Sequence, residues 1–189
     1  LIEFANIRKS GLRVVSLDAD DELIGVKFTN GENHIMLGTR CGKAIAFPED
    51  GVRSMGRTAR GVRGITLTDG DEVVAMDILK KGSEVLTVTE GGYGKRTSAD
   101  EYRPQTRGGK GLINMKVTEK TGPVVGIRVV RENQELMLIT TDGIVIRTTV
   151  DEISLISRNT QGVKLMTLGE ADRVASMATM NRIVDAAGE

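Results

Sequence analysis

The sequence predicts an all-β fold, a propeller-like array in which each repeat of about 50 residues supplies four short strands. Glycine recurs at a nearly constant interval, and short apolar runs separated by turn residues follow it in the same order each time. Few segments have the apolar period of an amphipathic helix. Four strands in a repeat of this length are typical of a propeller blade, and a superhelical stack of β-repeats is the main structural alternative.

The repeat is marked by a glycine followed by an apolar residue. Gly11, Gly61, Gly111 and Gly162 stand at intervals of 50, 50 and 51 residues. Each opens a strand-like run, at 11–17, 61–67, 111–117 and 162–168. A second apolar run follows an acidic or polar turn, at 23–26, 73–76, 124–127 and 174–177. A third lies at 35–37, 85–88 and 136–139, and a fourth leaves the next turn, as at 144–148. These runs are the expected strands.

The period also divides the chain. Residues 1–189 are expected to form part of one domain, with blade repeats at 11–60, 61–110 and 111–161. Residues 1–10 are interpreted as the tail of a preceding blade and residues 162–189 as a truncated or closing blade. Three blades and a piece do not close a ring in the usual way, so we expect a part of a larger domain with exposed ends.

Turn residues make two further predictions about local structure. Asn30-Gly31 and Asp142-Gly143 are typical of type I′ hairpin turns, in which both central residues need positive φ. Residues 99–102 and 151–153 are expected to form single helical turns, each just before a glycine-containing loop.

Composition excludes several classes of protein. The 26 basic and 26 acidic residues cancel, so any binding of nucleic acid has to come from segregated charge. Aromatic residues make up 3% and there is no Trp, which leaves Val, Ile, Leu and Met to build the core. The single cysteine, Cys41, rules out an internal disulfide and a cysteine-based metal site, and is expected in a strand or turn. No apolar run is long enough to cross a bilayer, and we expect a cytoplasmic fragment of a longer protein.

Charge is segregated within each repeat. In three repeats an arginine stands four residues before the repeat glycine, namely Arg57, Arg107 and Arg158. Residues 52–68 and 102–117 each hold four basic residues and no acid. If equivalent loops lie along one edge, a neutral protein carries a basic rim, which suits a polyanion such as the DNA backbone. The loop glycines would let backbone N–H groups approach phosphates. Surface loops are often basic, so the recurrence in three repeats favours the functional interpretation.

Other candidate sites are interpreted as structural. The glycine-lysine stretches 91–97 and 108–111 lack the spacing of a phosphate-binding loop and sit between strands. His34 is expected in an exposed turn, and Tyr93 and Tyr102 are expected to pack at an edge. We expect no catalytic residues and no metal site, because no Ser/His/Asp arrangement or supported carboxylate pair is present.

The loop 105–111, Gln-Thr-Arg-Gly-Gly-Lys-Gly, resembles the signature box of the C-terminal domain of DNA gyrase A subunits. Segments 55–65, 92–97 and 157–163 are similar to that family as well. The resemblance implies a β-pinwheel, a disc of about six four-stranded blades whose basic perimeter binds and bends DNA. It places this chain in the later blades, roughly the fourth to sixth, whereas the family's essential box lies in the first. With Thr106 in place of the commoner basic residue, the loop is expected to be an auxiliary copy.

The resemblance also implies a biological role. The domain would bind double-stranded DNA without sequence specificity and wrap it for a type IIA topoisomerase that introduces negative supercoils with ATP. Its partners would be the rest of gyrase A and gyrase B, in the bacterial cytoplasm at the nucleoid and not at a membrane. Catalytic residues, ATP and Mg²⁺ are expected elsewhere in the holoenzyme, and no cofactor is expected in this chain. The alternatives are the equivalent domain of topoisomerase IV, which usually lacks the full box, and a propeller for protein–protein interaction.

The residues expected to contact DNA come from the loops before the repeat glycines and from the strands that follow them. Lys95 and Arg96 are included although they follow a different turn. The set is Arg57, Arg60, Arg63, Lys95, Arg96, Arg103, Gln105, Arg107, Gly108, Gly109, Lys110, Gly111, Lys116, Arg158 and Lys164.

Overall fold

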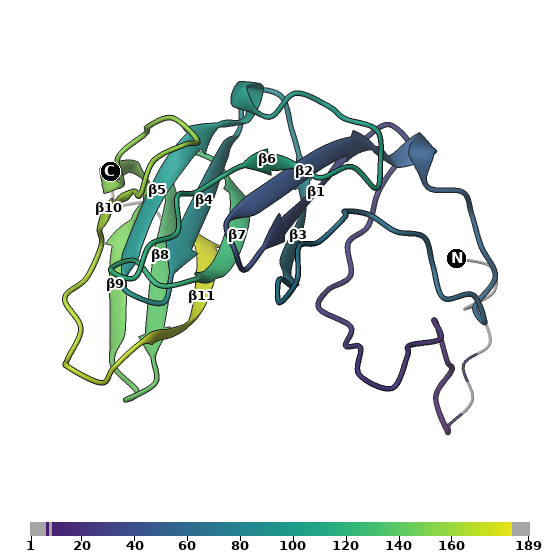
Figure 1. Cartoon of the computed structure of the whole chain (residues 1–189), viewed down its shortest axis with the longest axis horizontal. Helices are drawn as coiled ribbons and strands as arrows, with labels where there is room; N and C mark the ends of the chain where they lie inside the picture. Colours follow the sequence, from purple (N-terminus) through teal and green to yellow (C-terminus); the bar gives the residue numbers. More distant parts are fainter. Residues whose placement is uncertain (1–6, 8, 183–189) are drawn as a thin grey trace, which may run out of the picture.

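Three antiparallel sheets form the body of the protein and fan out in an arc (Figure 1). The structure is a computed structural model that describes residue 7 and residues 9–182. Within these residues the regular elements are strands and three short 3₁₀ turns, which confirms the all-β prediction. The turns are η2 (Glu49–Gly51), η3 (Ala99–Glu101) and η4 (Val150–Glu152), and the last two confirm the helical turns expected there.

The strands are distributed over the sheets in a repeating pattern. The first sheet has the order β3-β1-β2-β6 and contains β1 (His34–Thr39), β2 (Lys43–Pro48), β3 (Val73–Leu79) and β6 (Leu112–Ile113). The second has the order β10-β5-β4-β7 and contains β4 (Glu84–Thr89), β5 (Tyr93–Ser98), β7 (Val124–Val130) and β10 (Val163–Lys164). The third has the order β11-β8-β9 and contains β8 (Gln134–Thr140), β9 (Val145–Thr149) and β11 (Val174–Asn181).

Each complete sheet therefore takes strands from three successive sequence units. In the first sheet the β1–β2 hairpin comes from unit 11–60, β3 from unit 61–110 and β6 from unit 111–161. The second sheet repeats this one unit later. The units 11–60, 61–110 and 111–161 thus describe the period of the sequence, whereas a sheet interleaves neighbouring units.

The runs expected as the first strand of each unit are short or absent. Only two residues of 111–117 and two of 162–168 are strands, β6 and β10. The runs 11–17, 23–26 and 61–67 form no strand. Backbone groups of a strand need a neighbouring strand, and among the described residues β6 and β10 pair only with the outer edges of β2 and β5. Within the described residues no sheet covers the runs 11–17 and 23–26, in which Leu23 is 55% and Val26 72% exposed.

The prediction of type I′ turns was wrong. Gly143 has φ +82°, but among the described residues Asn133 alone has positive φ without being glycine, so Asp142 and Asn30 do not. The Gly143 N–H donates to the Thr140 carbonyl at 3.1 Å, so glycine is the last residue of this turn and not one of its two central residues. The β1–β2 and β4–β5 hairpins close in the same way, from Gly42 to Thr39 and from Gly92 to Thr89, each at 3.0 Å. Cys41 lies in the first of these turns, as expected, and is exposed.

Two apolar clusters hold the sheets together. One lies between the first and second sheets and the other between the second and third. Strand β4 contributes to both clusters, because successive side chains of a strand point to opposite faces of the sheet. Val85 belongs to one cluster, and Leu86 and Val88 belong to the other. The inner strands β3, β7 and β11 pack on one another in turn. Strands β2 and β5 consequently face outward in their sheets, where β6 and β10 join them.

Tyr102 and His34 differ from their predictions. Tyr102 is 2% exposed and belongs to the core between the first two sheets, not to an edge. Its hydroxyl donates to Asn114 Oδ1 at 2.5 Å, and Asn114 Nδ2 donates to Thr87 Oγ1 at 3.0 Å. His34 is half-buried at the start of β1, not in an exposed turn.

Candidate nucleic-acid interface

The loops before the three repeat glycines are structurally equivalent. In each, the carbonyl two residues before the glycine accepts a hydrogen bond from the backbone N–H that stands five residues after the previous repeat glycine. The pairs are Ser16 with Ala59 at 3.2 Å, Thr66 with Gly109 at 2.8 Å, and Lys116 with Thr160 at 2.9 Å. Two of these donor residues form a second hydrogen bond through their side chains. The Ser16 hydroxyl donates to the Thr58 carbonyl, and the Thr66 hydroxyl donates to the Gly108 carbonyl. The loops therefore occupy the same place in successive repeats.

The later two loops lie on the outer strands of their sheets. The Gln105 N–H donates to the Ala46 carbonyl in β2 at 2.7 Å. One repeat later, the Ile156 N–H donates to the Arg96 carbonyl in β5 at 2.9 Å. These loops thus run along the outer side of the arc, away from the packed inner strands.

The arginine four residues before the glycine fastens its loop to backbone carbonyls earlier in the chain. Arg107 Nη1 donates to the Arg63 carbonyl at 2.5 Å and its Nε to the Gly51 carbonyl at 3.0 Å. Arg158 Nη1 donates to the Ile113 carbonyl at 2.7 Å. Both side chains are half-buried. Their recurrence has a structural reason, because each guanidinium supplies donors to backbone carbonyls at the loop.

The repeat glycines allow a close approach between backbones. Gly111 has φ +71° and Gly162 has φ +76°. A Cβ atom at Gly111 would stand 2.7 Å from the Ala44 carbonyl oxygen, and one at Gly162 would stand 2.7 Å from that of Gly94. Both the backbone conformation and the contact with the outer strand require glycine here.

The glycine-rich loop 105–111 uses part of its backbone internally. The Gly108 N–H donates to the Gly64 carbonyl at 2.7 Å, and the Gly109 N–H donates to the Thr106 carbonyl at 3.3 Å. We expected glycine N–H groups to face phosphates, and for these two the structure shows protein partners instead. Gln105 is half-buried as well. The groups of this loop that remain candidates for an anion are therefore its side-chain cations.

Six of the predicted cations are exposed, and they lie in or next to these loops. They are Arg60, Arg63, Arg103, Lys110, Lys116 and Lys164. Arg60 forms an ion pair with Asp18 at 2.8 Å while both side chains stay largely exposed. Arg57 is half-buried, as are Arg107 and Arg158.

Two exposed arginines were missed from the sequence. Arg13 stands two residues after its repeat glycine, in the position of Arg63, and Arg53 stands eight residues before Gly61, in the position of Arg103. The period itself was the signal that could have found them.

Lys95 and Arg96 are not surface cations. Lys95 has no exposed surface, and its ammonium donates to the carbonyl of Ser157 at 2.7 Å. Arg96 pairs with Glu84 at 2.6 Å, donates through Nε to the Ile153 carbonyl at 2.7 Å, and has 12% of its side chain exposed. Strand β5 directs both side chains against the loop that crosses it, which removes them from direct contact with a ligand outside.

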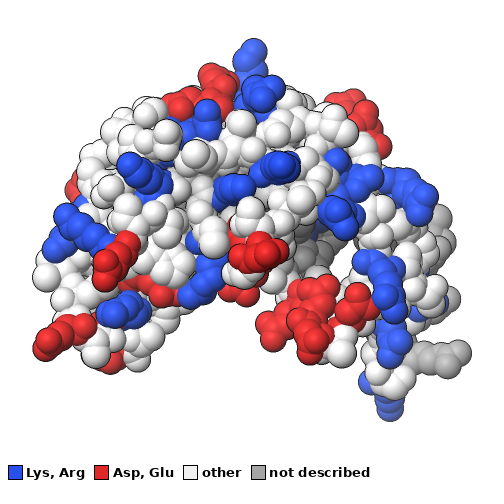
Figure 2. Space-filling view, in the orientation of Figure 1, with Lys and Arg blue, Asp and Glu red and all other residues white. Residues whose placement is uncertain are grey.

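Acidic residues interrupt the basic surface. Each 3₁₀ turn carries two acids in its first turn, Glu49 and Asp50, Asp100 and Glu101, and Asp151 and Glu152. Figure 2 shows basic side chains in a band across the face in view, with acids gathered mainly along the lower edge and in two groups at the upper edge. The charge is thus segregated, but not into an unbroken stripe.

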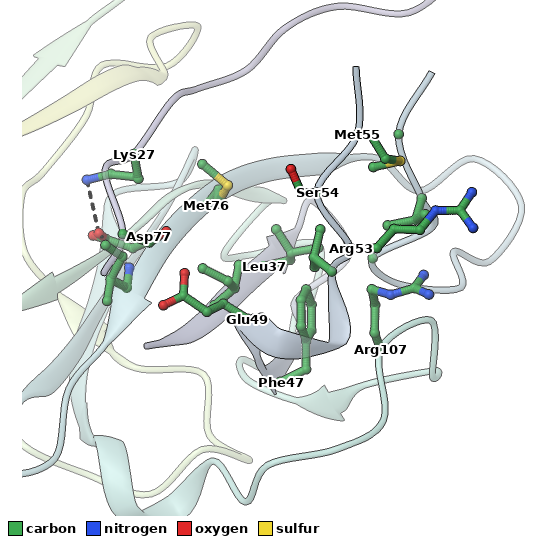
Figure 3. Close-up of a pocket in the computed structure, with 17 residues that line it drawn as sticks. Lys27, Leu37, Phe47, Glu49, Arg53, Ser54, Met55, Met76, Asp77 and Arg107 are labelled. Carbon is green, nitrogen blue, oxygen red and sulfur yellow. Dashed lines mark hydrogen bonds and ion pairs between the residues drawn. The ribbon is translucent and has the colours of Figure 1, made fainter. Parts of the chain in front are cut away.

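A cavity of about 500 Å³ opens on the face of the first sheet that points away from the second sheet. Leu37 and Phe47 form part of its apolar lining, and a Lys27–Asp77 ion pair of 3.0 Å lies on one side. On the opposite side Arg53 and Arg107 extend in the same direction (Figure 3). Arg107 thus links the glycine-rich loop to the wall of this cavity.

The part of the chain that the structure describes shows neither a metal-holding cluster nor a membrane-spanning helix. No group of three His, Cys, Asp or Glu residues there could hold a metal ion. No helix among the described residues is long and apolar enough to span a membrane.

Comparison with protein families decides what these repeats belong to. The family described as "DNA gyrase C-terminal domain, beta-propeller" matches four successive segments, 3–30, 33–80, 83–131 and 134–179. The chain belongs to the DNA gyrase C-terminal domain family. The family repeats follow the sheets, because 33–80 holds β1, β2 and β3, and 83–131 holds β4, β5 and β7. A gyrase-type blade is thus one family repeat plus a two-residue strand from the next.

Curated relatives of the gyrase family are similar over nearly the whole chain. The DNA gyrase A subunit of Haloquadratum walsbyi is 50% identical over 184 residues, 96% of this chain and 22% of that protein. The corresponding Salmonella typhimurium protein is 46% identical over 185 residues, 98% of this chain and 21% of that protein. The chain spans about a fifth of the length of these relatives.

Solved structures share the gyrase-type fold. A C-terminal domain of DNA topoisomerase IV has a TM-score of 0.89 at 25% identity and covers 94% of this chain and 56% of its own. A DNA gyrase A C-terminal domain has a TM-score of 0.83 at 27% identity, covering 90% of this chain and 58% of its own. The two fold matches are similar, whereas the sequence relatives at 44–50% identity are named as gyrase.

Proposed function

We propose that this chain binds the backbone of double-stranded DNA along the loops before its repeat glycines and wraps the duplex for a DNA gyrase. In the holoenzyme, with the rest of gyrase A and with gyrase B, it would serve ATP-driven negative supercoiling at the bacterial nucleoid. The observation that carries the proposal is the recurrence of exposed cations in or next to equivalent loops of a chain in the gyrase C-terminal domain family.

The direct contacts are assigned to the exposed cations Arg60, Arg63, Arg103, Lys110, Lys116 and Lys164, with Arg57 at the first loop. Arg107, Arg158 and Lys95 act behind them by holding the loops in place. The loop glycines permit the close packing that brings these cations to the outer side. Phosphate contacts of this kind give affinity without base sequence preference.

Wrapping requires that contacts offset the cost of bending. Bending a site of about 20–30 base pairs through about 40–90° costs on the order of 1–6 kcal/mol. Loops repeated at regular intervals along an arc supply phosphate contacts at successive points of the duplex, which is what a bent path needs. The catalytic residues, ATP and Mg²⁺ are assigned to other parts of the holoenzyme.

The test of DNA binding is the salt dependence of duplex affinity, measured by fluorescence anisotropy. Lys110→Glu combined with Lys164→Glu is expected to weaken binding and to lower the slope of log K against log salt by about 0.9 for each phosphate that is no longer neutralised. Arg131→Glu is the matched control, since Arg131 is exposed in the β7–β8 connection beside an inner strand. Equal affinity of the double variant and the wild type at low salt would show that the outer loops are not the contact surface.

The test of wrapping is the linking number of a nicked circular plasmid that is sealed by ligase in the presence of the chain. Wrapping changes the linking number, whereas straight binding does not. An unchanged linking number with intact DNA binding would restrict the proposal to binding alone.

The second candidate is the equivalent domain of a topoisomerase IV, favoured by the TM-score of 0.89 to that domain. A reconstituted holoenzyme carrying this chain separates the two. Net introduction of negative supercoils supports the gyrase role, and relaxation or decatenation without supercoiling supports the alternative. Retention of no DNA at low salt would favour a protein-interaction propeller.

A further inference from the structure

A buried lysine lies beneath the last of the three loops. Lys95 in β5 is 0% exposed, and its ammonium is surrounded by three acceptors from residues 157–160. Nζ donates to the Ser157 carbonyl at 2.7 Å, to the Arg158 carbonyl, and to Thr160 Oγ1 at 3.1 Å. A buried cation without partners is costly, so this full set of acceptors is what allows Lys95 to remain inside.

In the preceding repeat, the residue below the equivalent loop is apolar and not a cation. Ile45 in β2 stands fifty residues before Lys95, is also 0% exposed, and lies beneath the loop that contains Gly108 and Gly109. There Gly108 adopts φ +80° and the Gly109 N–H donates to the Thr106 carbonyl at 3.3 Å. The glycine pair closes the loop on itself, so an apolar side chain suffices below it.

The later loop does not take this backbone path. Asn159 and Thr160 replace the glycine pair, and Asn159 does not adopt positive φ. The Thr160 N–H donates to the Arg158 carbonyl at 2.9 Å and the Thr160 hydroxyl donates to the Ser157 carbonyl at 2.9 Å, and both carbonyls also accept a hydrogen bond from Lys95. The Lys95 ammonium supplies a second donor to each of these inward carbonyls, which an isoleucine could not supply.

We propose that Lys95 is a positioning residue, an internal cation that sets the backbone of loop 157–160 and with it the place of Arg158 on the outer side of the arc. The two repeats thus pair residue and loop differently. An apolar side chain lies below the Gly-Gly loop, and an ammonium group lies below the Asn-Thr loop. The role of Lys95 does not depend on the proposed function, because it concerns the loop alone.

The charged groups around Lys95 come from three elements. Glu101 is the last residue of η3 and accepts the Arg158 backbone N–H through Oε2 at 3.0 Å, and Arg158 itself lies in the loop. Arg96 is the neighbour on β5. Burial lowers the pKa of Lys95 to about 8, with Glu101 acting to raise it and Arg158 to lower it. Loss of the proton leaves two N–H donors for three acceptors.

The experiment is amide hydrogen exchange of residues 157–161 in the whole chain, with Lys95→Met and with Lys95→Ile combined with Asn159→Gly and Thr160→Gly. Lys95→Met keeps the shape of the stem, and its loop is expected to exchange about tenfold faster or more, the scale of a lost buried charged hydrogen bond. The triple variant recreates the arrangement at Ile45 and is expected to restore protection. Unchanged protection in Lys95→Met would overturn the proposal, because filling space would then be the whole role of Lys95.

A pH series supplies the readout that packing alone would not move. In the wild type, loop protection corrected for intrinsic exchange is expected to fall as pH rises past about 8, and in Lys95→Met it is expected not to change. If Lys95→Met also lowers protection in β4 and β8, the fold has been lost, and the wild-type pH series then decides. A pH-independent loop in the wild type would contradict the proposal.

Discussion

Arg107 donates a hydrogen bond from Nη1 to the backbone carbonyl of Arg63, at 2.5 Å. Arg158 forms the corresponding bond to Ile113 one repeat later. In both cases the acceptor stands two residues after a repeat glycine and the donor stands four residues before the next. The most regular feature of the basic loops is therefore a fastening within each unit, from its last loop back to the run that follows its first glycine, and the cations that face solvent are their neighbours.

This geometry predicts that the recurrent arginines contribute to stability. Arg107→Lys and Arg158→Lys keep the charge but lose the planar guanidinium that reaches the carbonyl, so each is expected to lower the free energy of unfolding by about 1–2 kcal/mol. Lys110→Ala, at an exposed position in the same loop, should change it by less than about 0.5 kcal/mol. Urea denaturation followed by circular dichroism measures both. Equal effects at Arg107 and Lys110 would contradict the fastening role.

The repeat glycines give a prediction with an internal control. Gly162→Ala meets both a positive φ and a carbonyl 2.7 Å from the new Cβ, so we expect a loss of more than about 2 kcal/mol. Gly61→Ala meets only the positive φ, since nothing lies within 4 Å of its Cβ, and the expected cost is about 1 kcal/mol. Thermal denaturation of the two variants compares them. A cost at Gly61 as large as at Gly162 would show that backbone conformation alone sets the requirement.

The sequence predicted what depends on local pattern and period. The hairpin strands β1 with β2, β4 with β5 and β8 with β9 follow from apolar runs and turn residues, and the equivalence of the three loops follows from the spacing of their glycines. The interleaving of the sheets could not be predicted, because pairing of β6 with β2 and of β10 with β5 joins residues far apart in the chain. Lys95 was misassigned for the same reason, since its acceptors lie more than sixty residues away in sequence.

The buried hydrogen bonds that join Tyr102, Asn114 and Thr87 between the first two sheets are expected to contribute to stability. Tyr102→Phe removes the donor to Asn114 and leaves its Oδ1 without that partner at a site with no exposed surface. We expect a loss of about 1–3 kcal/mol, the cost of an unsatisfied buried polar group. The double variant Tyr102→Phe with Asn114→Leu should lose less than the sum of the two single variants, because the unpaired group is gone. Strict additivity in a double-mutant cycle would contradict coupling through this bond.

Burial of Lys95 predicts a dependence of global stability on pH. Its pKa is about 8 in the folded chain, below the ordinary value of 10.5, so between these values the unfolded chain binds more protons than the folded one. The contribution of this group to the free energy of unfolding therefore rises with pH from about 8 to about 10.5, and the cost of burying the charge is present in full below that window. The measurement is urea unfolding of the wild type and of Lys95→Met across this range. The wild type should gain stability relative to the variant as pH rises, even while loop 157–160 loses protection. A difference that stays constant or falls with pH would show that the lysine is not titrating inside the fold.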